Sequence, residues 1–215
     1  MGSVLRAGLP AFWVTSLAKI LVGEQPCQFE TWMKAHYEIE KRPRSDAGSL
    51  AKWKADHTEQ LQAEIVRLKA AGWRCTIEKY FRVTGQTAIL AGKPDVIVQA
   101  PNKRPKIVDV KSGRERDSDT MQVLIYMVTI PMAWQAPTMI FDGEVVYPTY
   151  RIHVEPAEAE AIRPKLFALV KQLAGTTRPD PTPSEVNCRF CDVNETDCPQ
   201  RYVATETVDI LTSEF

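Results

Sequence analysis

Residues 92–126 read GKPDVIVQAPNKRPKIVDVKSGRERDSDTMQVLIY, and the prediction of the fold begins from this segment. Two Val- and Ile-rich runs, residues 95–100 and 106–110, flank the polar segment 101–105, which holds two prolines and an asparagine. Apolar β-branched runs on either side of such a segment predict a β-hairpin. Asp95 begins the first predicted strand, and Asp109-Val110-Lys111 end the second.

The carboxylates of this hairpin predict a metal site. Side chains alternate along a strand, so Asp109 and Lys111 lie on one face while Val110 lies on the other. Asp95 of the first strand can then lie beside Asp109 and Lys111 of the second. Two adjacent carboxylates repel each other unless a divalent cation such as Mg²⁺ joins them, and an ammonium group nearby can assist phosphodiester hydrolysis. The alternative is a hairpin whose Asp and Lys side chains are simply solvated.

A helix is predicted to follow over residues 117–130, ended by Pro131. Gln122 and Tyr126 are four residues apart and therefore share one face of this helix.

Together, these motifs resemble the nuclease core of the PD-(D/E)XK superfamily in its RecB-like branch. The resemblance implies that Asp95, Asp109 and the carbonyl of Val110 bind the metal, and that Lys111 assists the water. It also implies that Gln122 and Tyr126 orient the site and the DNA. Asp109 departs mildly from the pattern, because Glu is commoner there.

The resemblance also implies a histidine ligand on the helix before the sheet. Residues 48–64, which hold Gly48, His57 and Glu64, resemble the corresponding helix of the RecB-like nucleases. His57 is the preferred ligand and His36 the competitor, while His153 is expected to be structural. Because imidazole suits Mn²⁺ better than Mg²⁺, a His57 ligand predicts activity in Mn²⁺ at least as good as in Mg²⁺.

Five cysteines are present, and four of them predict a second metal centre. Cys188, Cys191 and Cys198 form a C-x-x-C-x6-C-P pattern, and Cys27 is the natural fourth ligand. Four thiolates accept either Zn²⁺ or a [4Fe–4S] cluster, and spacing does not separate the two. Cys75 is expected in the core.

The order of these motifs resembles the iron–sulfur nucleases of the RecB-like group, and in size the CRISPR-associated protein four family. This resemblance implies a [4Fe–4S] cluster and a single-stranded DNA exonuclease with 5′ to 3′ polarity. It further implies DNA trimming for CRISPR adaptation beside the integrase proteins. Two rival interpretations are a non-catalytic DNA-binding subunit on the same fold and a zinc-stapled nuclease of phage recombination or restriction.

Composition sets few limits on this function. The chain has 215 residues and a formal net charge of zero, so a DNA-binding surface must concentrate its positive charge locally. Candidate basic segments are residues 41–44, 103–106 and 114–116. An odd number of cysteines without a signal peptide predicts a reducing compartment, with the cytoplasm as default, and no membrane segment is expected.

The predicted architecture is an α/β fold with a restriction-endonuclease-like mixed sheet flanked by helices. Residues 1–42 are expected to form N-terminal helices, with Thr15 or Ser16 as a helix cap and Gly23 ending the first. Residues 43–174 are expected to form the nuclease core. It begins with a helix over 50–71, whose apolar stripe holds Leu61, Ile65 and Leu68. Strands are expected within 73–90 and on both sides of a turn at 141–144, and a helix over 155–174 follows. Residues 175–202 carry the three-cysteine segment, and 203–215 form a flexible tail.

Overall fold

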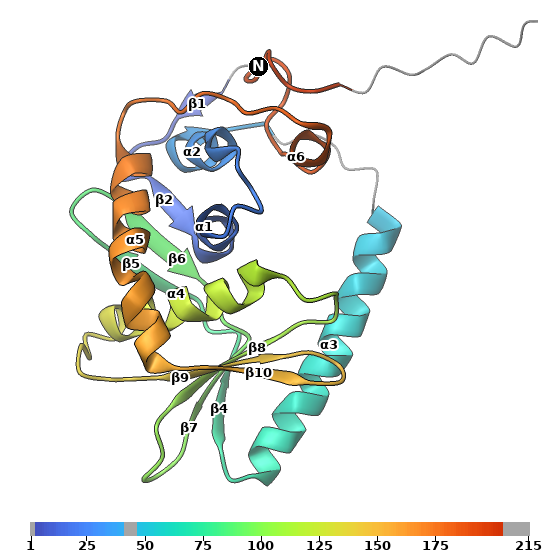
Figure 1. Ribbon diagram of the computed structural model, residues 1–215, viewed down its shortest axis with the longest axis vertical. Coiled ribbons are helices and arrows are strands. Elements are labelled where there is room, and N and C mark those ends of the chain that lie inside the picture. The colour runs from blue at the N-terminus through green and yellow to red at the C-terminus, as the bar shows by residue number, and fades with distance from the viewer. Residues whose placement is uncertain (1–2, 41–46, 204–215) are drawn as a thin grey trace, which may run out of the picture.

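A mixed five-stranded sheet is the framework of the protein. The computed structural model describes residues 3–40 and 47–203. The strand order is β10-β9-β8-β7-β4, with β8 and β9 parallel and the other neighbours antiparallel (Figure 1). The strands are β4 (Arg74–Ile77), β7 (Val96–Gln99), β8 (Lys106–Val110), β9 (Asp142–Val146) and β10 (Arg151–Val154).

The hairpin predicted around Asp95 and Asp109 is present. β7 and β8 pair antiparallel, with Val96 opposite Val108 and Val98 opposite Lys106. Asn102 in the connecting turn has a φ of 58°, a left-handed conformation that asparagine tolerates. The register places Asp95, one residue before β7, close to Asp109 near the end of β8.

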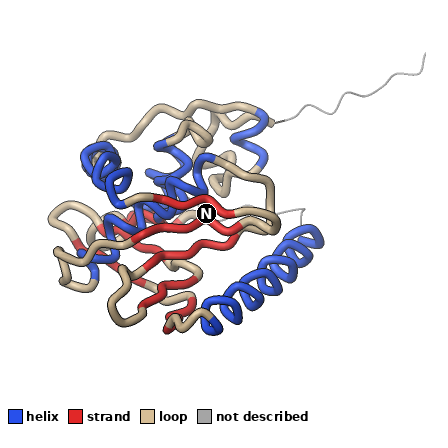
Figure 2. Tube along the Cα trace, turned by 60° about the horizontal axis from the view of Figure 1, so that its bottom comes forward, coloured by secondary structure: helices blue, strands red, loops and turns tan. Residues whose placement is uncertain are grey.

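Helices cover the two faces of this sheet, and Figure 2 shows the strands between α3 and the other helices. On one face, α3 (Ala47–Ala70) packs Leu61, Ile65 and Leu68 against valines of β7, β8 and β9, so its predicted apolar stripe is confirmed. On the other face lies α4 (Asp117–Ala133), which contacts β8 and β9. Gly143 in β9 allows this approach, because a Cβ there would lie 2.6 Å from the Val123 side chain.

A second sheet lies beside the first, with the order β2-β6-β5. Its strands are β2 (Ala11–Trp13), β5 (Phe81–Thr84) and β6 (Ile89–Gly92), and β2 runs parallel to β6. At the end of β6, a Cβ on Gly92 would lie 2.7 Å from the Tyr126 ring and 2.9 Å from the Phe81 ring. Glycine is therefore required at the point where the chain leaves this sheet toward Asp95.

The N-terminal and C-terminal segments pack together at one end of the molecule (Figure 1). α1 (Val14–Leu21) packs on α4 and α5 (Pro156–Ala174), while α2 (Gln28–His36) lies over the end of α5. Trp32 Nε1 donates to the Gly175 carbonyl at 3.0 Å, and Lys34 pairs with Asp192 at 2.8 Å. The short helix α6 (Glu185–Arg189) follows, and the two-residue strands β1 (Val4–Leu5) and β3 (Tyr37–Glu38) pair at this end.

Several local predictions were wrong. Residues 142–144 belong to β9 rather than to a turn, and residues 147–150 connect β9 to β10. The predicted end at Pro131 is also wrong, because α4 continues to Ala133. The N-cap of α1 is Trp13 without a side-chain hydrogen bond, so neither Thr15 nor Ser16 caps the helix.

Other predictions hold or fall outside the described residues. The helix over 155–174 is confirmed as α5, and Gly23 follows α1 with a φ of 77°. Residues 41–46, which include the basic segment 41–44, and the tail 204–215 lie outside the described residues. No helix in the described part of the chain is long and apolar enough to cross a membrane.

A buried carboxylate ties α3 to the sheet. Glu64, whose side chain is 4% exposed, accepts two hydrogen bonds from Arg67 and two from Arg151 of β10, at 2.6–2.9 Å. Burial acts to raise the pKa of Glu64, but the two guanidinium groups lower it from 4.5 to about 2. The glutamate that the family resemblance singled out therefore joins the helix to an edge strand.

Replacing Glu64 with Gln is expected to lower the free energy of unfolding by about 2 kcal/mol at pH 7, because two partly buried arginines lose a charged partner. Since the folded-state pKa lies below the ordinary value, this stabilisation is fully present above about pH 4.5 and is lost as the pH falls toward 2. Urea unfolding of both proteins from pH 7 to pH 3 should show the difference shrinking. Glu160→Gln, at a 66% exposed side chain paired with Arg163, is the matched control and should change stability little. A Glu64→Gln effect that stays constant with pH contradicts the prediction.

Candidate active site

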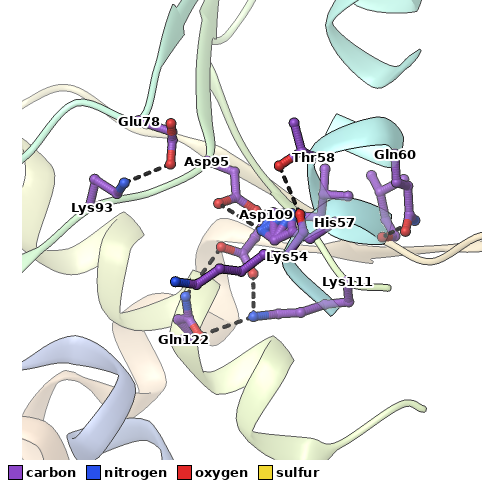
Figure 3. A network of polar contacts seen from close by, with 12 residues as sticks. Lys54, His57, Thr58, Gln60, Glu78, Lys93, Asp95, Asp109, Lys111 and Gln122 are labelled. Carbon is purple, nitrogen blue, oxygen red and sulfur yellow. Dashed lines mark hydrogen bonds and ion pairs between the residues drawn. The ribbon is translucent and has the colours of Figure 1, made fainter. Parts of the chain in front are cut away.

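Two carboxylates from the β7–β8 hairpin form the centre of the candidate site (Figure 3). The side chains of Asp95 and Asp109 are 14% and 2% exposed. Asp95 Oδ2 accepts a hydrogen bond from the backbone N–H of Val110 at 2.7 Å, which fastens the start of β7 to the end of β8. The predicted proximity of the two aspartates is confirmed.

The electrostatics of this pair favour a bound cation. Burial, together with the negative charge of Asp109, raises the pKa of Asp95 to about 8. Among the described residues, Asp109 Oδ2 has no hydrogen-bond partner, and it forms an ion pair with Lys111. Ionising both carboxylates together costs free energy, and one Asp109 oxygen lacks a hydrogen bond. Such a pair matches the oxygen ligands that hard divalent cations use.

Lys111 is held by three side chains. Its Nζ lies 2.7 Å from Asp109 Oδ2, 3.2 Å from Gln122 Oε1 and 3.5 Å from Asp119 Oδ1. Burial acts to lower the pKa of Lys111, but the surrounding carboxylates outweigh it and raise the pKa above its ordinary value. The lysine is therefore a fixed cation beside the carboxylate pair.

The predicted pair on α4 also reaches the site. Gln122 Nε2 donates to Asp109 Oδ1 at 3.2 Å and to the Tyr126 hydroxyl at 3.1 Å. Burial and the charge of Asp109 raise the pKa of Tyr126 above its ordinary value, so its phenol stays neutral. Its ring meets the Phe81 ring edge-on at 5.8 Å. Gln122 thus bridges the lysine, the carboxylate and the phenol.

Of the histidines, only His57 reaches the carboxylates. Its Nε2 lies 3.7 Å from Asp95 Oδ1, and its Nδ1 is buried without a hydrogen-bond partner among the described residues. Burial lowers the pKa of His57, which favours the neutral imidazole that metals bind. His36 instead stacks on Trp32 at 4.5 Å, with Nε2 2.9 Å from the Leu173 carbonyl, and His153 lies beside Glu144.

Two residues that the sequence did not single out complete the surroundings of Lys111. Asp119, 8% exposed, is the third residue of α4, and its Oδ2 accepts from the Tyr147 hydroxyl at 2.9 Å and from the Arg116 N–H at 3.2 Å. The acidic pair at 117 and 119 was a signal, since carboxylates favour a helix N-terminus. Tyr147, in contrast, follows a strand whose position was predicted wrongly.

A cavity of about 940 Å³ is lined by residues other than those of the candidate site. It lies between the segment 114–117, which follows Lys111 closely in the chain, and α1, α2 and α6. Its lining is mixed in charge: it includes Lys19, Arg114 and Arg116, and also Glu24, whose carboxylate accepts from the Ser118 N–H at 2.9 Å.

The four cysteines singled out by spacing line one small cavity of about 20 Å³, with Cys27 at the N-cap of α2 and the other three in the C-terminal segment. Burial, followed by the neighbouring thiols of Cys27 and Cys188, raises the pKa of Cys198, and burial raises that of Cys191 to about 12. Cys75 lies elsewhere, in β4 against the α3 cluster.

With their pKa values raised, the thiols of Cys191 and Cys198 stay protonated unless a metal binds them. The donor set therefore fits a thiolate-bound centre. Within residues 3–40 and 47–203, however, no group of three or more His, Cys, Asp or Glu side chains is arranged to hold a metal ion. Side chains in both candidate centres would have to turn toward a bound metal.

A buried arginine organises the cysteine segment. Arg201, 6% exposed, donates from Nη1 to the Val193 carbonyl at 2.6 Å and from Nη2 to the Cys188 carbonyl. The backbone N–H of Tyr202 donates to Cys188 Sγ at 3.4 Å. These contacts fold the segment back on itself around the thiols.

The sequence model of the PD-(D/E)XK nuclease superfamily matches residues 13–199. The chain belongs to this superfamily. Membership indicates a metal-dependent nuclease that acts on DNA with a divalent ion such as Mg²⁺ or Mn²⁺. The mixed sheet flanked by helices agrees with this assignment.

Comparison with other proteins adds little detail. The chain is similar to the solved protein described as "Crystal structure of SSO0001", at 13% sequence identity and a TM-score of 0.43, over 92% of this chain and 90% of that one. No curated protein matches the sequence significantly.

Replacing Asp119 with Asn is expected to lower kcat for DNA cleavage roughly 10-fold with little change in KM, because Lys111 loses one of its fixed partners. Asp117→Asn, which removes an exposed carboxylate from the same first turn of α4, controls for the loss of helix-terminal charge and should leave kcat within a factor of two. Steady-state cleavage with excess Mn²⁺ measures both. Equal kcat values for the two variants would show that Asp119 does not position the lysine.

Proposed function

We propose that this protein is a metal-dependent nuclease that degrades single-stranded DNA from an end. One observation carries the proposal: Asp95, Asp109, Lys111 and Gln122 converge in one network in which two buried carboxylates face a fixed cation. Membership of a nuclease superfamily supports the reaction class.

The residues take the following roles. Asp95, Asp109, the carbonyl of Val110 and His57 hold Mg²⁺ or Mn²⁺, which on binding supplies Lewis-acid activation of a water and of the scissile phosphate. Lys111 orients the attacking water and offsets negative charge that develops on the phosphate.

The α4 pair acts through Lys111. Gln122 fixes the direction of the lysine through its amide oxygen, while its amide nitrogen holds Asp109 and the Tyr126 hydroxyl. Tyr126 thereby fixes the Gln122 rotamer and orients the site toward DNA.

Asp95→Ala and Lys111→Ala are each expected to reduce cleavage of end-labelled single-stranded DNA in Mn²⁺ by at least 1000-fold, because one removes a metal ligand and the other the water-orienting cation. Lys165→Ala, at an exposed lysine of α5, is the control and should cut normally. Circular dichroism checks that each variant is folded. Full activity in a folded Asp95→Ala or Lys111→Ala protein would remove the proposed site.

The main rival is a non-catalytic DNA-binding subunit on the same fold. All the motif residues are present and in mutual contact, which favours an active enzyme. Wild-type protein that binds single-stranded DNA but never cuts it in Mn²⁺ or Mg²⁺ would favour the rival.

We propose further that Cys27, Cys188, Cys191 and Cys198 bind a [4Fe–4S] cluster that ties the N-terminal helices to the C-terminal segment. Their shared cavity and the backbone bonds of Arg201 support a common centre. Zn²⁺ is the alternative occupant, and it would indicate a nuclease of another pathway whose terminal segments are joined by a structural zinc site.

Anaerobically purified protein is expected to be brown and to contain about four iron and four sulfide per chain, because a [4Fe–4S] cluster takes four thiolate ligands. Cys198→Ser should lose most of the iron and lower the melting temperature, since metal binding contributes to folding. Cys75→Ser is the matched control, because Cys75 lies outside the four-cysteine cavity, and should keep the iron. Colourless wild-type protein that contains zinc would overturn the iron–sulfur assignment and leave the nuclease proposal intact.

From the family resemblance, we also propose that cleavage runs 5′ to 3′ and that the protein trims DNA for CRISPR adaptation beside integrase proteins. The division into residues 1–42, 43–174, 175–202 and 203–215 and a cytoplasmic location are proposals too. In this division the four-cysteine centre ties the N-terminal helices to the C-terminal segment.

A further inference from the structure

An exposed tryptophan lies directly beside the candidate metal ligand His57. Trp53 is 49% exposed, and its ring meets the His57 ring edge-on, with the centroids 5.5 Å apart. His57 Nε2 in turn lies 3.7 Å from Asp95 Oδ1. The indole therefore borders the place where a scissile phosphate would bind, with half of its surface still in water.

The surroundings of Trp53 are charged rather than apolar. Lys52 and Lys54 flank it in the sequence, both are exposed, and no ion pair involves either of them within the described ranges 3–40 and 47–203. In Figure 3 the Lys54 side chain extends from α3 toward the Gln122 side of the site. An exposed aromatic ring with a lysine on each side of it in the sequence matches a ligand that combines rings with phosphates.

We propose that Trp53 is a stacking platform for an unpaired base of single-stranded nucleic acid, and that Lys52 and Lys54 bind the phosphates on either side of it. A base in a duplex has both faces covered by its neighbours, so an indole can stack only on a base that is unpaired or terminal. The platform thus selects single strands and frayed ends at the site where they are cut. This inference deepens the proposed function and rests on it for the position of the scissile phosphate.

A protein partner fits this surface less well. Seating an apolar protein surface on Trp53 would take Lys52, Lys54 and the exposed Asp56 out of water, which costs free energy unless each charge is paired. A nucleotide strand leaves these side chains in water and supplies phosphates to the two lysines. The charges therefore favour nucleic acid as the occupant.

The test measures binding without cleavage. Lys111→Ala protein, in EDTA, is titrated against a fluorescent oligothymidine, and Trp53→Ala, Trp53→Phe and Val66→Ala are each added to this background. Trp53→Ala should weaken binding roughly 10-fold, Trp53→Phe should restore most of it, and Val66→Ala, at a 66% exposed position of the same helix, should have no effect. A blunt duplex of equal length should bind all four proteins alike.

A second arm removes the base instead of the indole. An oligonucleotide in which abasic sites replace the bases should bind the Lys111→Ala protein more weakly than the normal strand does. Its affinity for the Lys111→Ala protein should equal its affinity for the Lys111→Ala protein that also carries Trp53→Ala. In otherwise wild-type protein, Trp53→Ala should raise KM for single-stranded DNA and leave kcat at saturation unchanged.

Failure of this inference differs from failure of the nuclease proposal. Active enzyme in which Trp53→Ala changes neither binding nor KM would overturn the platform and leave the nuclease standing. A protein that never cuts, but whose single-strand binding depends on Trp53 and on the bases, would keep the platform and overturn the nuclease. If Trp53→Ala weakened the binding of normal and abasic strands equally, the stacking platform would be overturned, because Trp53 would then act through folding alone.

Discussion

The repulsion between two buried carboxylates is the constraint around which this structure is arranged. Asp95 and Asp109 lie side by side on one hairpin with little access to water, so each makes the charge of the other more costly. The protein offsets this with the Val110 N–H, the Gln122 amide and the ammonium group of Lys111. None of these groups cancels both charges, so a divalent cation of the kind that nucleases of this superfamily use would complete the charge balance.

The arrangement needs both faces of the sheet. α3 packs on one face and carries His57 to Asp95, while α4 packs on the other and carries Gln122 to Asp109 and Lys111. Gly143 lets α4 approach β9, and Gly92 leaves room for the Tyr126 ring. These two glycines thus allow α4 to lie close enough to the sheet for its side chains to reach the site.

Much of this site could be predicted from local patterns. The β7–β8 hairpin, the shared face of Asp109 and Lys111, and the pairing of Gln122 with Tyr126 all follow from strand and helix periodicity within 35 residues of chain. The preference for His57 over His36 came from the family resemblance, and the geometry agrees with it.

Contacts between distant segments could not be predicted in this way. β2 reads as the start of an apolar helix, and only its pairing with β6 makes it a strand. β9 looked like a turn because Asp142-Gly143 is typical of turns, yet glycine is needed there for the packing of α4. Asp119, Tyr147 and Arg201 depend on partners that only the folded chain brings near.

The parallel pairing of β2 with β6 also bears on the order of events during synthesis. Ala11 pairs with Ile89, so the first of these strands leaves the ribosome 78 residues before the second. The apolar face of α1 packs on α4 and α5, so it stays largely uncovered until these later helices have also been synthesised. Pairings so distant in sequence form slowly, and uncovered apolar segments are prone to aggregate. The nascent chain is therefore expected to spend much of its synthesis as a client of chaperones.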